Sequence, residues 1–201
     1  DFCLSRGLGD VYKRQETLQA AGVDVLAGFM AAESEAQGRI WLTANRNQRP
    51  FVTLKWASSL DGRAAASDGS SQWITGSEAR ADVHLRRSQA DAILAGTGTV
   101  QADNAELTAR TETGDYFENQ PLRVVLGERE LDLNLRVFND KAETVHLHTR
   151  NIHGALAELW ARGIKHVFVE GGPEVASHFE RLNLVDEYLI YLAPVLLGGD
   201  R

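Results

Sequence analysis

Short apolar segments alternate with helical patterns along most of this chain, and this alternation rules out most fold classes. Apolar runs typical of buried strands lie at residues 51–56, 91–95, 122–126, 144–147, 167–169 and 188–192. Helical patterns lie between several of them, at residues 78–88, 154–161 and 174–182, and Thr75 and Glu78 have capping-box spacing. Apolar strands separated by helices are typical of a mainly parallel sheet covered on both faces. The sequence therefore predicts an α/β fold.

The chain divides into three parts. Residues 1–15 include the run Asp-Val-Tyr-Lys-Arg-Gln, which one reading frame of a sequencing-library adaptor encodes, so we expect them to be an adaptor artefact. Residues 16–48 carry only short helical patterns, chiefly a helix at 31–45, which is too little for a domain. Because a proline disfavours helix in the residue before it, the Arg49-Pro50 step marks the start of a domain at residues 49–201. The chain stops soon after a strand-like run, so we expect this domain to be truncated at its C-terminus.

Composition excludes several classes of function. The formal net charge of −7 argues against a broad nucleic-acid surface. No apolar run approaches the roughly 20 residues of a membrane span, and the start of the chain lacks a signal-peptide pattern, so we expect a cytoplasmic protein without a membrane partner. Cys3 is the single cysteine, and His146 and His148 have no third ligand at a recognisable spacing. The sequence therefore predicts no metal site.

Four places carry side chains suited to ligand binding. The first, residues 55–63, begins with Lys55 in an apolar setting, so this lysine is either a partnered structural residue or an active-site cation. In the second, residues 71–75, Trp73 is more simply interpreted as a core anchor than as a ring that stacks on a ligand. Arg87, on the helix that follows, suits a phosphate, although paired arginines on helices are more often solvated.

The other two places are rich in glycine. Residues 96–110 follow a strand with a Gly-x-Gly pattern, which lacks the third glycine of the dinucleotide fingerprint and is a weak signal. Residues 169–173 run from a strand into a helix whose first residue is Pro173. Two glycines there clear space for a ligand, and the amides exposed at such a helix start suit the pyrophosphate of a dinucleotide. A plain strand-to-helix turn explains this segment equally well.

Together these segments resemble a known family. The matching motifs are residues 55–63 (KWASSLDGR), 71–75 (SQWIT), 99–110 (TVQADNAELTAR), 170–173 (EGGP) and 193–199 (APVLLGG). They resemble the reductase domain of the bifunctional diaminohydroxyphosphoribosylaminopyrimidine deaminase / 5-amino-6-(5-phosphoribosylamino)uracil reductase of riboflavin biosynthesis. Residues 16–46 resemble the tail of the preceding deaminase domain, so we expect residues 16–48 to be its remnant and the linker. The zinc motif of that deaminase domain is absent from this sequence, so we expect no deaminase activity.

The resemblance implies a dihydrofolate-reductase-like fold that binds NADPH and reduces the ribose of a phosphoribosylaminopyrimidine to a ribityl chain, in a homodimer or larger assembly. The residues that it places against the cofactor are Ala57, Trp73, Thr99, Asp103, Gly172, Pro173, Glu174, Val175, Ala176, Ser177 and His178. The residues that it places against the substrate are Ser71, Arg87, Leu107, Arg110 and Glu170. This division suits their chemistry, because arginines bind a ribose phosphate and a glycine-rich helix start binds a pyrophosphate.

The expected reaction needs a proton as well as a hydride. The cofactor supplies the hydride, and a ring-opened substrate presents an imine at the first carbon of the sugar. Asp103 and Lys55 are the catalytic candidates for delivering the proton, directly or through water. Arg129 and Arg150 follow strand ends and are candidates for the extra phosphate of NADPH. Two alternatives stay open: a pterin or folate reductase of the same fold, which needs no arginines for a sugar phosphate, and a non-catalytic nucleotide-binding fragment.

The chain departs from the family pattern at three places. The triplet Asp103-Asn-Ala105 stands where the family has Asp-Asp-Pro, and Gly127-Glu128 stands where it has Asp followed by a hydroxyl residue. The second difference argues against a cofactor hydrogen bond from position 128. The chain also ends before the last strands of the family, so we expect an unpaired sheet edge.

Overall fold

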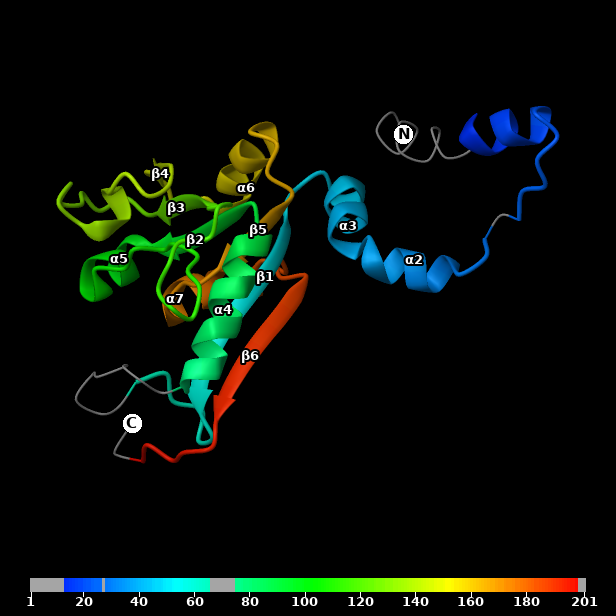
Figure 1. The fold of residues 1–201 in the computed structure, drawn as a ribbon. Helices are drawn as coiled ribbons and strands as arrows, with labels where there is room; N and C mark the ends of the chain where they lie inside the picture. Colours follow the sequence, from blue (N-terminus) through cyan, green and yellow to red (C-terminus); the bar gives the residue numbers. More distant parts are fainter. Residues whose placement is uncertain (1–12, 27, 66–74, 199–201) are drawn as a thin grey trace.

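The computed structural model describes residues 13–26, 28–65 and 75–198, and a parallel sheet forms the centre of the molecule (Figure 1). The sheet has six strands in the order β4-β3-β2-β5-β1-β6, and every neighbouring pair is parallel. The strands are β1 (Phe51–Ser59), β2 (Ala92–Gly96), β3 (Leu122–Leu126), β4 (Thr144–Leu147), β5 (His166–Val169) and β6 (Glu187–Ala193). The predicted α/β class is confirmed, and each predicted strand coincides with an observed one to within a few residues.

Helices cover both faces of this sheet, as predicted. On one face α6 (Ile152–Ala161) and α7 (Pro173–Arg181) pack against alternate strand residues such as Leu94, which is fully buried. On the other face α4 (Ser77–Gln89) and α5 (Thr97–Asp103) pack against the intervening residues. Because both faces are covered, β2 is apolar along its whole length and its neighbours β3 and β5 are largely so, and this explains the apolar runs of the sequence.

Two helical predictions were wrong. The segment at 31–45 forms two helices, α2 (Ala31–Gln37) and α3 (Arg39–Asn47), and Gly38 separates them because glycine is a poor helix former. The predicted capping box is absent: Gly76 precedes α4, and no side chain caps it. The Thr75 carbonyl instead accepts a hydrogen bond of 2.8 Å from the Arg80 guanidinium.

A third helix, α5, was not predicted at all. Its seven residues include Gly98 and two threonines, which are weak helix formers, so the segment has no strong helical pattern of its own. The buried Val100 anchors it in the core that lies beside β2 and β3. Tertiary packing therefore decides this element, and the glycine-rich segment at residues 96–110 begins with a helix that the sequence pattern did not indicate.

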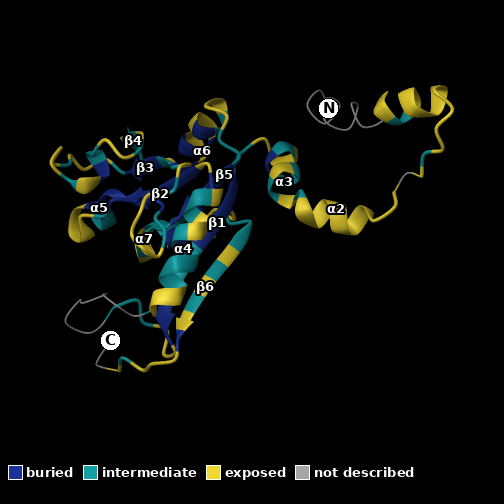
Figure 2. Ribbon diagram, in the orientation of Figure 1, coloured by how far each residue is buried: buried dark blue, intermediate teal, exposed yellow. Residues whose placement is uncertain are grey.

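The N-terminal helices lie to one side of the sheet. Figures 1 and 2 show α2 extending away from the sheet with exposed residues, and none of its residues is buried. The helix α3 is tied to the sheet by Arg39, whose guanidinium pairs with the Glu187 carboxylate of β6. Just after α3, the Arg49 guanidinium donates hydrogen bonds of 2.6 and 2.9 Å to the Asp186 carboxylate. None of the described helices is long and apolar enough to cross a bilayer.

The strand β6 forms one edge of the sheet in the described part of the chain. It pairs with β1 on one side, and no described strand pairs with its other side. Three of its large apolar residues, Tyr188, Ile190 and Leu192, are exposed and alternate with less exposed neighbours (Figure 2).

Candidate active site

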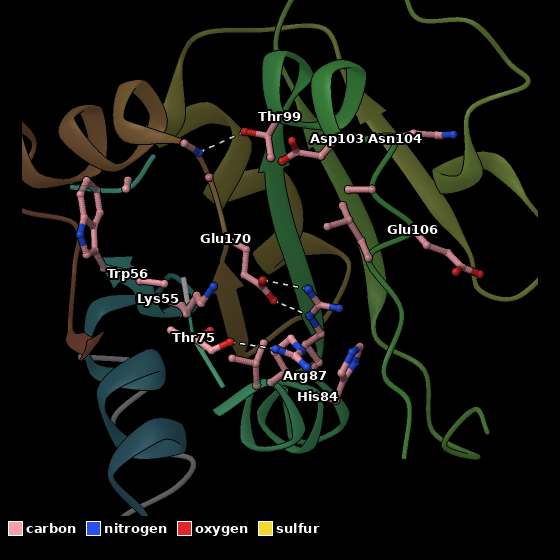
Figure 3. Close-up of a pocket in the computed structure, with 18 of the residues that line it drawn as sticks. Lys55, Trp56, Thr75, His84, Arg87, Thr99, Asp103, Asn104, Glu106 and Glu170 are labelled. Carbon is pink, nitrogen blue, oxygen red and sulfur yellow. Dashed lines mark hydrogen bonds and ion pairs between the residues drawn. The ribbon is translucent and has the colours of Figure 1, made fainter. Parts of the chain in front are cut away.

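A cavity of about 590 Å³ lies where the central strands end, and we call it the first cavity (Figure 3). It forms because β1 continues past the end of β5: β1 pairs with β5 up to Leu54, but with β6 up to Ser59. Lys55 from the extended part of β1 and Glu170 from the residue after β5 both line the space. Parallel sheets bind ligands at the carboxyl ends of their strands, and this volume suits a small molecule.

Arg87 and Glu170 form a buried ion pair in the first cavity. The Arg87 Nε and Nη2 atoms donate to the two Glu170 carboxylate oxygens, the latter at 2.9 Å, and Nη1 donates to the Thr108 carbonyl at 2.9 Å. Burial opposes charge on both groups, but their mutual attraction outweighs it: the pKa of Glu170 is lowered and that of Arg87 is raised. Both residues therefore stay charged, while the pair as a whole has no net charge.

A second group of charges surrounds Glu106, whose side chain is only 3% exposed. Its Oε1 atom accepts hydrogen bonds of 2.8 Å from the Tyr116 hydroxyl and the Asn139 amide. Its Oε2 atom accepts a hydrogen bond from the Arg136 guanidinium and lies 3.8 Å from Arg110 Nη1. Burial alone would raise the pKa of Glu106, but these hydrogen bonds and positive charges lower it. These five residues are called the Glu106 cluster, and their carboxylate is ionised at neutral pH.

His84 lies between the two charged groups. Its Nδ1 atom is 3.1 Å from the Thr108 carbonyl oxygen and 3.2 Å from the backbone nitrogen of Arg110. Burial, followed by the positive charges of Arg87 and Arg110, lowers the pKa of His84 to about 4. The imidazole is therefore neutral at pH 7, and it helps to fix the backbone that carries Arg110.

A second cavity of about 260 Å³ adjoins the first, and Thr99, Gly172 and Pro173 line both. The Gly172 N–H donates a hydrogen bond of 3.1 Å to the Thr99 hydroxyl at this junction. The second cavity reaches Glu128 and Arg150, which form an exposed ion pair at 3.1 Å. The two cavities together offer an elongated site with charged groups at both ends.

Comparison with known proteins identifies the family. Residues 50–201 match the family model described as RibD C-terminal domain, which is more than half of the 201 residues. The chain belongs to this family.

The curated relatives of this RibD-family chain are named Riboflavin biosynthesis protein RibD. The Mycobacterium tuberculosis protein is 48% identical over 184 residues, which cover 90% of this chain and 53% of that protein. The Escherichia coli protein is 33% identical over 215 residues, covering 91% of this chain and 59% of the relative. The chain thus spans little more than half the length of the curated relatives that it matches.

Solved structures give the same family. The RibD structure of Acinetobacter baumannii (form 1) superposes with a TM-score of 0.83 at 32% identity, over 93% of this chain and 58% of that one. A structure from Thermotoga maritima, titled as a diaminohydroxyphosphoribosylaminopyrimidine deaminase / 5-amino-6-(5-phosphoribosylamino)uracil reductase, has a TM-score of 0.80 at 31% identity, over 92% and 56%. The predicted dihydrofolate-reductase-like fold is confirmed by these matches.

Most of the site residues predicted for a RibD-family chain line the two cavities. Those that line the first are Lys55, Ala57, Arg87, Thr99, Asp103, Leu107, Arg110, Glu170, Gly172 and Pro173. Those that line the second are Thr99, Gly172, Pro173, Glu174, Val175 and His178. Ala176 is buried in the core, and the Ser177 hydroxyl donates to the Glu174 carbonyl, so neither residue lines a cavity. Ser71 and Trp73 lie outside the described residues.

The glycines of the site serve packing more than expected. A Cβ atom on Gly171 would lie 2.5 Å from the Cβ of Val175, and one on Gly96 would lie 2.7 Å from Val175 Cγ2. Any side chain at these two positions would therefore push α7 away from the ends of β2 and β5. The prediction that both glycines after β5 clear space for a ligand is therefore wrong for Gly171, which makes room for α7. At Gly172 an added Cβ atom would meet only the Thr99 hydroxyl, at 3.2 Å.

Two residues near α5 have left-handed backbone conformations. Asn104 ends α5 with a φ of 43°, and its Oδ1 atom accepts a hydrogen bond of 2.9 Å from the Arg136 N–H. Asparagine adopts this conformation more readily than most residues do. Leu107 has a φ of 53° although its side chain is buried. Leu107 thus holds a backbone geometry that is costly for a leucine.

Among the residues of the site that were not predicted are His84, Glu106 and Arg136. His84 lies three residues before Arg87, so the two share a helical face, and this spacing was an available signal. Glu106 lies inside a motif that was recognised, but nothing in the sequence marks it as buried. Arg136 has no local signal, because only the fold brings it to Glu106 from 30 residues away.

His146 of β4 contacts His148, which follows the strand. The rings of His146 and His148 lie 3.7 Å apart, and His146 Nε2 is 2.9 Å from the Gly127 carbonyl oxygen. His148 is exposed and His146 is half-buried. In the described part of the chain, no group of three or more His, Cys, Asp or Glu residues is arranged to hold a metal ion.

Proposed function

We propose that this chain carries out the NADPH-dependent reduction of the ribose of 5-amino-6-(5-phosphoribosylamino)uracil to the ribitylamino product. The observation that carries the proposal is the junction of the two cavities at Thr99, Gly172 and Pro173, in a chain of the RibD C-terminal domain family. A hydride transfer needs the donor carbon of the cofactor and the acceptor carbon of the substrate to be in contact, and two adjoining cavities allow this. The names of the relatives support the choice of substrate.

The first cavity is assigned to the substrate. Arg110 lines it with a partly exposed guanidinium and is the proposed phosphate ligand. Arg87, in contrast, gives its donors to Glu170 and Thr108, so its part is to hold the Glu170 carboxylate in place as an acceptor. The phosphate role that the sequence divided between two arginines is therefore assigned to Arg110.

The second cavity is assigned to the adenosine and pyrophosphate part of NADPH. No side chain caps α7, and its first amides lie beside this cavity, so they are free to donate to a pyrophosphate. Arg129 and Arg150 also line it and can meet the additional phosphate that distinguishes NADPH from NADH. When bound, the cofactor supplies the hydride.

The proton that completes the reduction is assigned to Asp103 or Lys55, which both line the first cavity. Figure 3 shows Asp103 beside Thr99, at the junction with the second cavity, and Lys55 on the side of Glu170. Either group can donate to the nitrogen of the substrate imine, directly or through one water molecule, while the carbon of that imine receives the hydride.

The test of this function is a pair of measurements on the purified protein. NADPH oxidation should depend on 5-amino-6-(5-phosphoribosylamino)uracil, should not occur with a pterin or a dihydrofolate in its place, and should be unchanged by a chelator or by added zinc. NADPH should bind more tightly than NADH, and replacing Arg129 and Arg150 together with glutamine should abolish the difference. Turnover of a pterin would favour the alternative reductase, and binding of NADPH without any turnover would favour a non-catalytic module.

A further inference from the structure

We propose that Arg136 binds the terminal phosphate of the substrate together with Arg110, and that the buried Glu106 positions both guanidinium groups. This inference rests on the proposed function, because it takes the phosphoribosyl group as the ligand. It adds to that function a residue which comes from outside the recognised motifs.

The contacts of Glu106 bring the two arginines together. Arg110 Nη1 and Arg136 Nη2 both approach the same carboxylate oxygen, Oε2. Neutral donors, the Tyr116 hydroxyl and the Asn139 amide, occupy the other oxygen at 2.8 Å. Because a single atom is shared, the guanidinium groups cannot be far apart, and all three charged residues line the first cavity. Figure 3 shows Glu106 on the opposite side of this cavity from Trp56.

The charges of the cluster suit an anion. Two guanidinium groups and one carboxylate leave one net positive charge on this wall of the cavity. The pair of Arg87 and Glu170 on the neighbouring wall has none. A sugar phosphate carries close to two negative charges at neutral pH, so it gains most from a site with two guanidinium forks. With only one arginine beside it, the charge of the buried glutamate would cancel the charge of that arginine, and the phosphate would be attracted much less.

The backbone of Arg136 is fixed, although its side chain is not buried. Asn104 accepts its N–H, and the following residue, Val137, is fully buried in the core. The side chain itself is 53% exposed. An arginine whose role was only to neutralise Glu106 would be expected to be buried with it, and this exposure leaves N–H groups available to a ligand. A fixed backbone with free donors is a preorganised anion ligand.

The test compares the ribitylamino product with its phosphate and the same product without it, as ligands of the protein. In Arg136→Gln, binding of the phosphorylated product should weaken about tenfold, while binding of the dephosphorylated product should stay within about twofold. Arg136→Lys keeps the positive charge beside Glu106 but loses the two-pronged guanidinium. Its affinity for the phosphorylated product should lie between those of the unmodified protein and Arg136→Gln. The matched control is Arg162→Gln, since Arg162 is a similarly exposed arginine paired with a glutamate, at 2.8 Å from Glu158 on α6. It should bind both products as the unmodified protein does.

Each other outcome has a distinct meaning. If Arg136→Gln weakens both products equally, the arginine only supports the fold and the inference is wrong. If Arg136→Gln still prefers the phosphorylated product by the original factor, Arg136 does not touch the phosphate and the inference is again wrong. If Arg136→Gln does not fold, the same criteria apply to Arg136→Lys, which retains a cation for Glu106. If the unmodified protein does not prefer the phosphorylated product, the proposed function itself fails.

Discussion

The two cavities hold arginine and carboxylate pairs of the same chemistry in different surroundings. In the first, the side chains of Arg87 and Glu170 are 14% and 9% exposed, and in the second those of Arg150 and Glu128 are 72% and 59% exposed. The buried pair is held by several hydrogen bonds in one arrangement, whereas water can replace either partner of the exposed pair. The charges of the first cavity are therefore fixed in place, whereas those of the second can rearrange.

The largest effect should come from breaking the buried pair. In Arg87→Ala, Glu170 is left as a buried charge without its partner, and such a change costs about 3–5 kcal/mol in the free energy of unfolding. Urea denaturation of the two proteins measures this directly. The double variant Arg87→Met with Glu170→Leu should recover much of the loss, because it leaves no unpaired charge. A loss below about 1 kcal/mol in Arg87→Ala would mean that the pair is as weak as the exposed one.

A smaller but more specific effect is expected at Arg110. Replacing it with alanine should remove the proposed charge-assisted contact to the substrate phosphate, at a cost of about 1.5–3 kcal/mol in substrate binding. NADPH binding should be nearly unchanged, because Arg110 lines only the first cavity. Titrations of both ligands on the unmodified protein and the variant provide the measurement. Loss of NADPH binding alone would reverse the assignment of the two cavities, and no change in either would place Arg110 outside the site.

The fixed character of the first cavity should also appear in the pH dependence of stability. Burial and two positive charges lower the pKa of His84 from 6.5 to about 4, so the unfolded chain takes up this proton at a higher pH than the folded chain does. The free energy of unfolding should be fully retained above about pH 6.5 and should fall as the pH is lowered toward 4. His84→Gln should reduce this slope between pH 6.5 and 5. If the slope is unchanged in His84→Gln, the loss of stability at low pH comes instead from His166, because burial also lowers the pKa of His166.

The smallest effect is expected at the exposed pair of the second cavity. Glu128→Gln should change the free energy of unfolding by no more than about 0.5 kcal/mol, since exposed ion pairs contribute little. The measurement is the same urea denaturation as for Arg87→Ala, which makes the two pairs directly comparable. A loss of 2 kcal/mol or more, on the order of a buried contact, would remove the distinction between the cavities.

The strands were predictable because their signal is local. The five residues of β2 are all buried, so the apolar run itself identifies the strand. The helix α5 was not predictable, because Thr97 to Asp103 has weak helical propensity and is held by packing around Val100. The break at Gly38 was visible in the sequence, but the helical pattern on both sides of it concealed its effect.

Residues that line the cavities could be predicted one by one, but their contacts could not. Arg87 and Glu170 were each predicted to meet the substrate and both line the first cavity, yet their pairing joins positions 83 residues apart, and no spacing rule predicts it. The same holds for Glu106, which the sequence presents as an ordinary polar residue within a loop. The Glu106 carboxylate matters because it is buried and therefore needs charged and hydrogen-bonding partners, and the burial of a polar side chain depends on the whole fold.

The left-handed conformation of Leu107 has a consequence for protein engineering. Replacing a strained non-glycine residue with glycine often stabilises a protein, and here it would relieve roughly 1–2 kcal/mol of backbone strain. The same change would remove a side chain that is only 4% exposed, and deleting a buried leucine costs about 2–5 kcal/mol. The cost of deleting the side chain exceeds the strain that is relieved, so Leu107→Gly should destabilise the protein. A directed-evolution library selected for thermal tolerance should therefore retain leucine at residue 107.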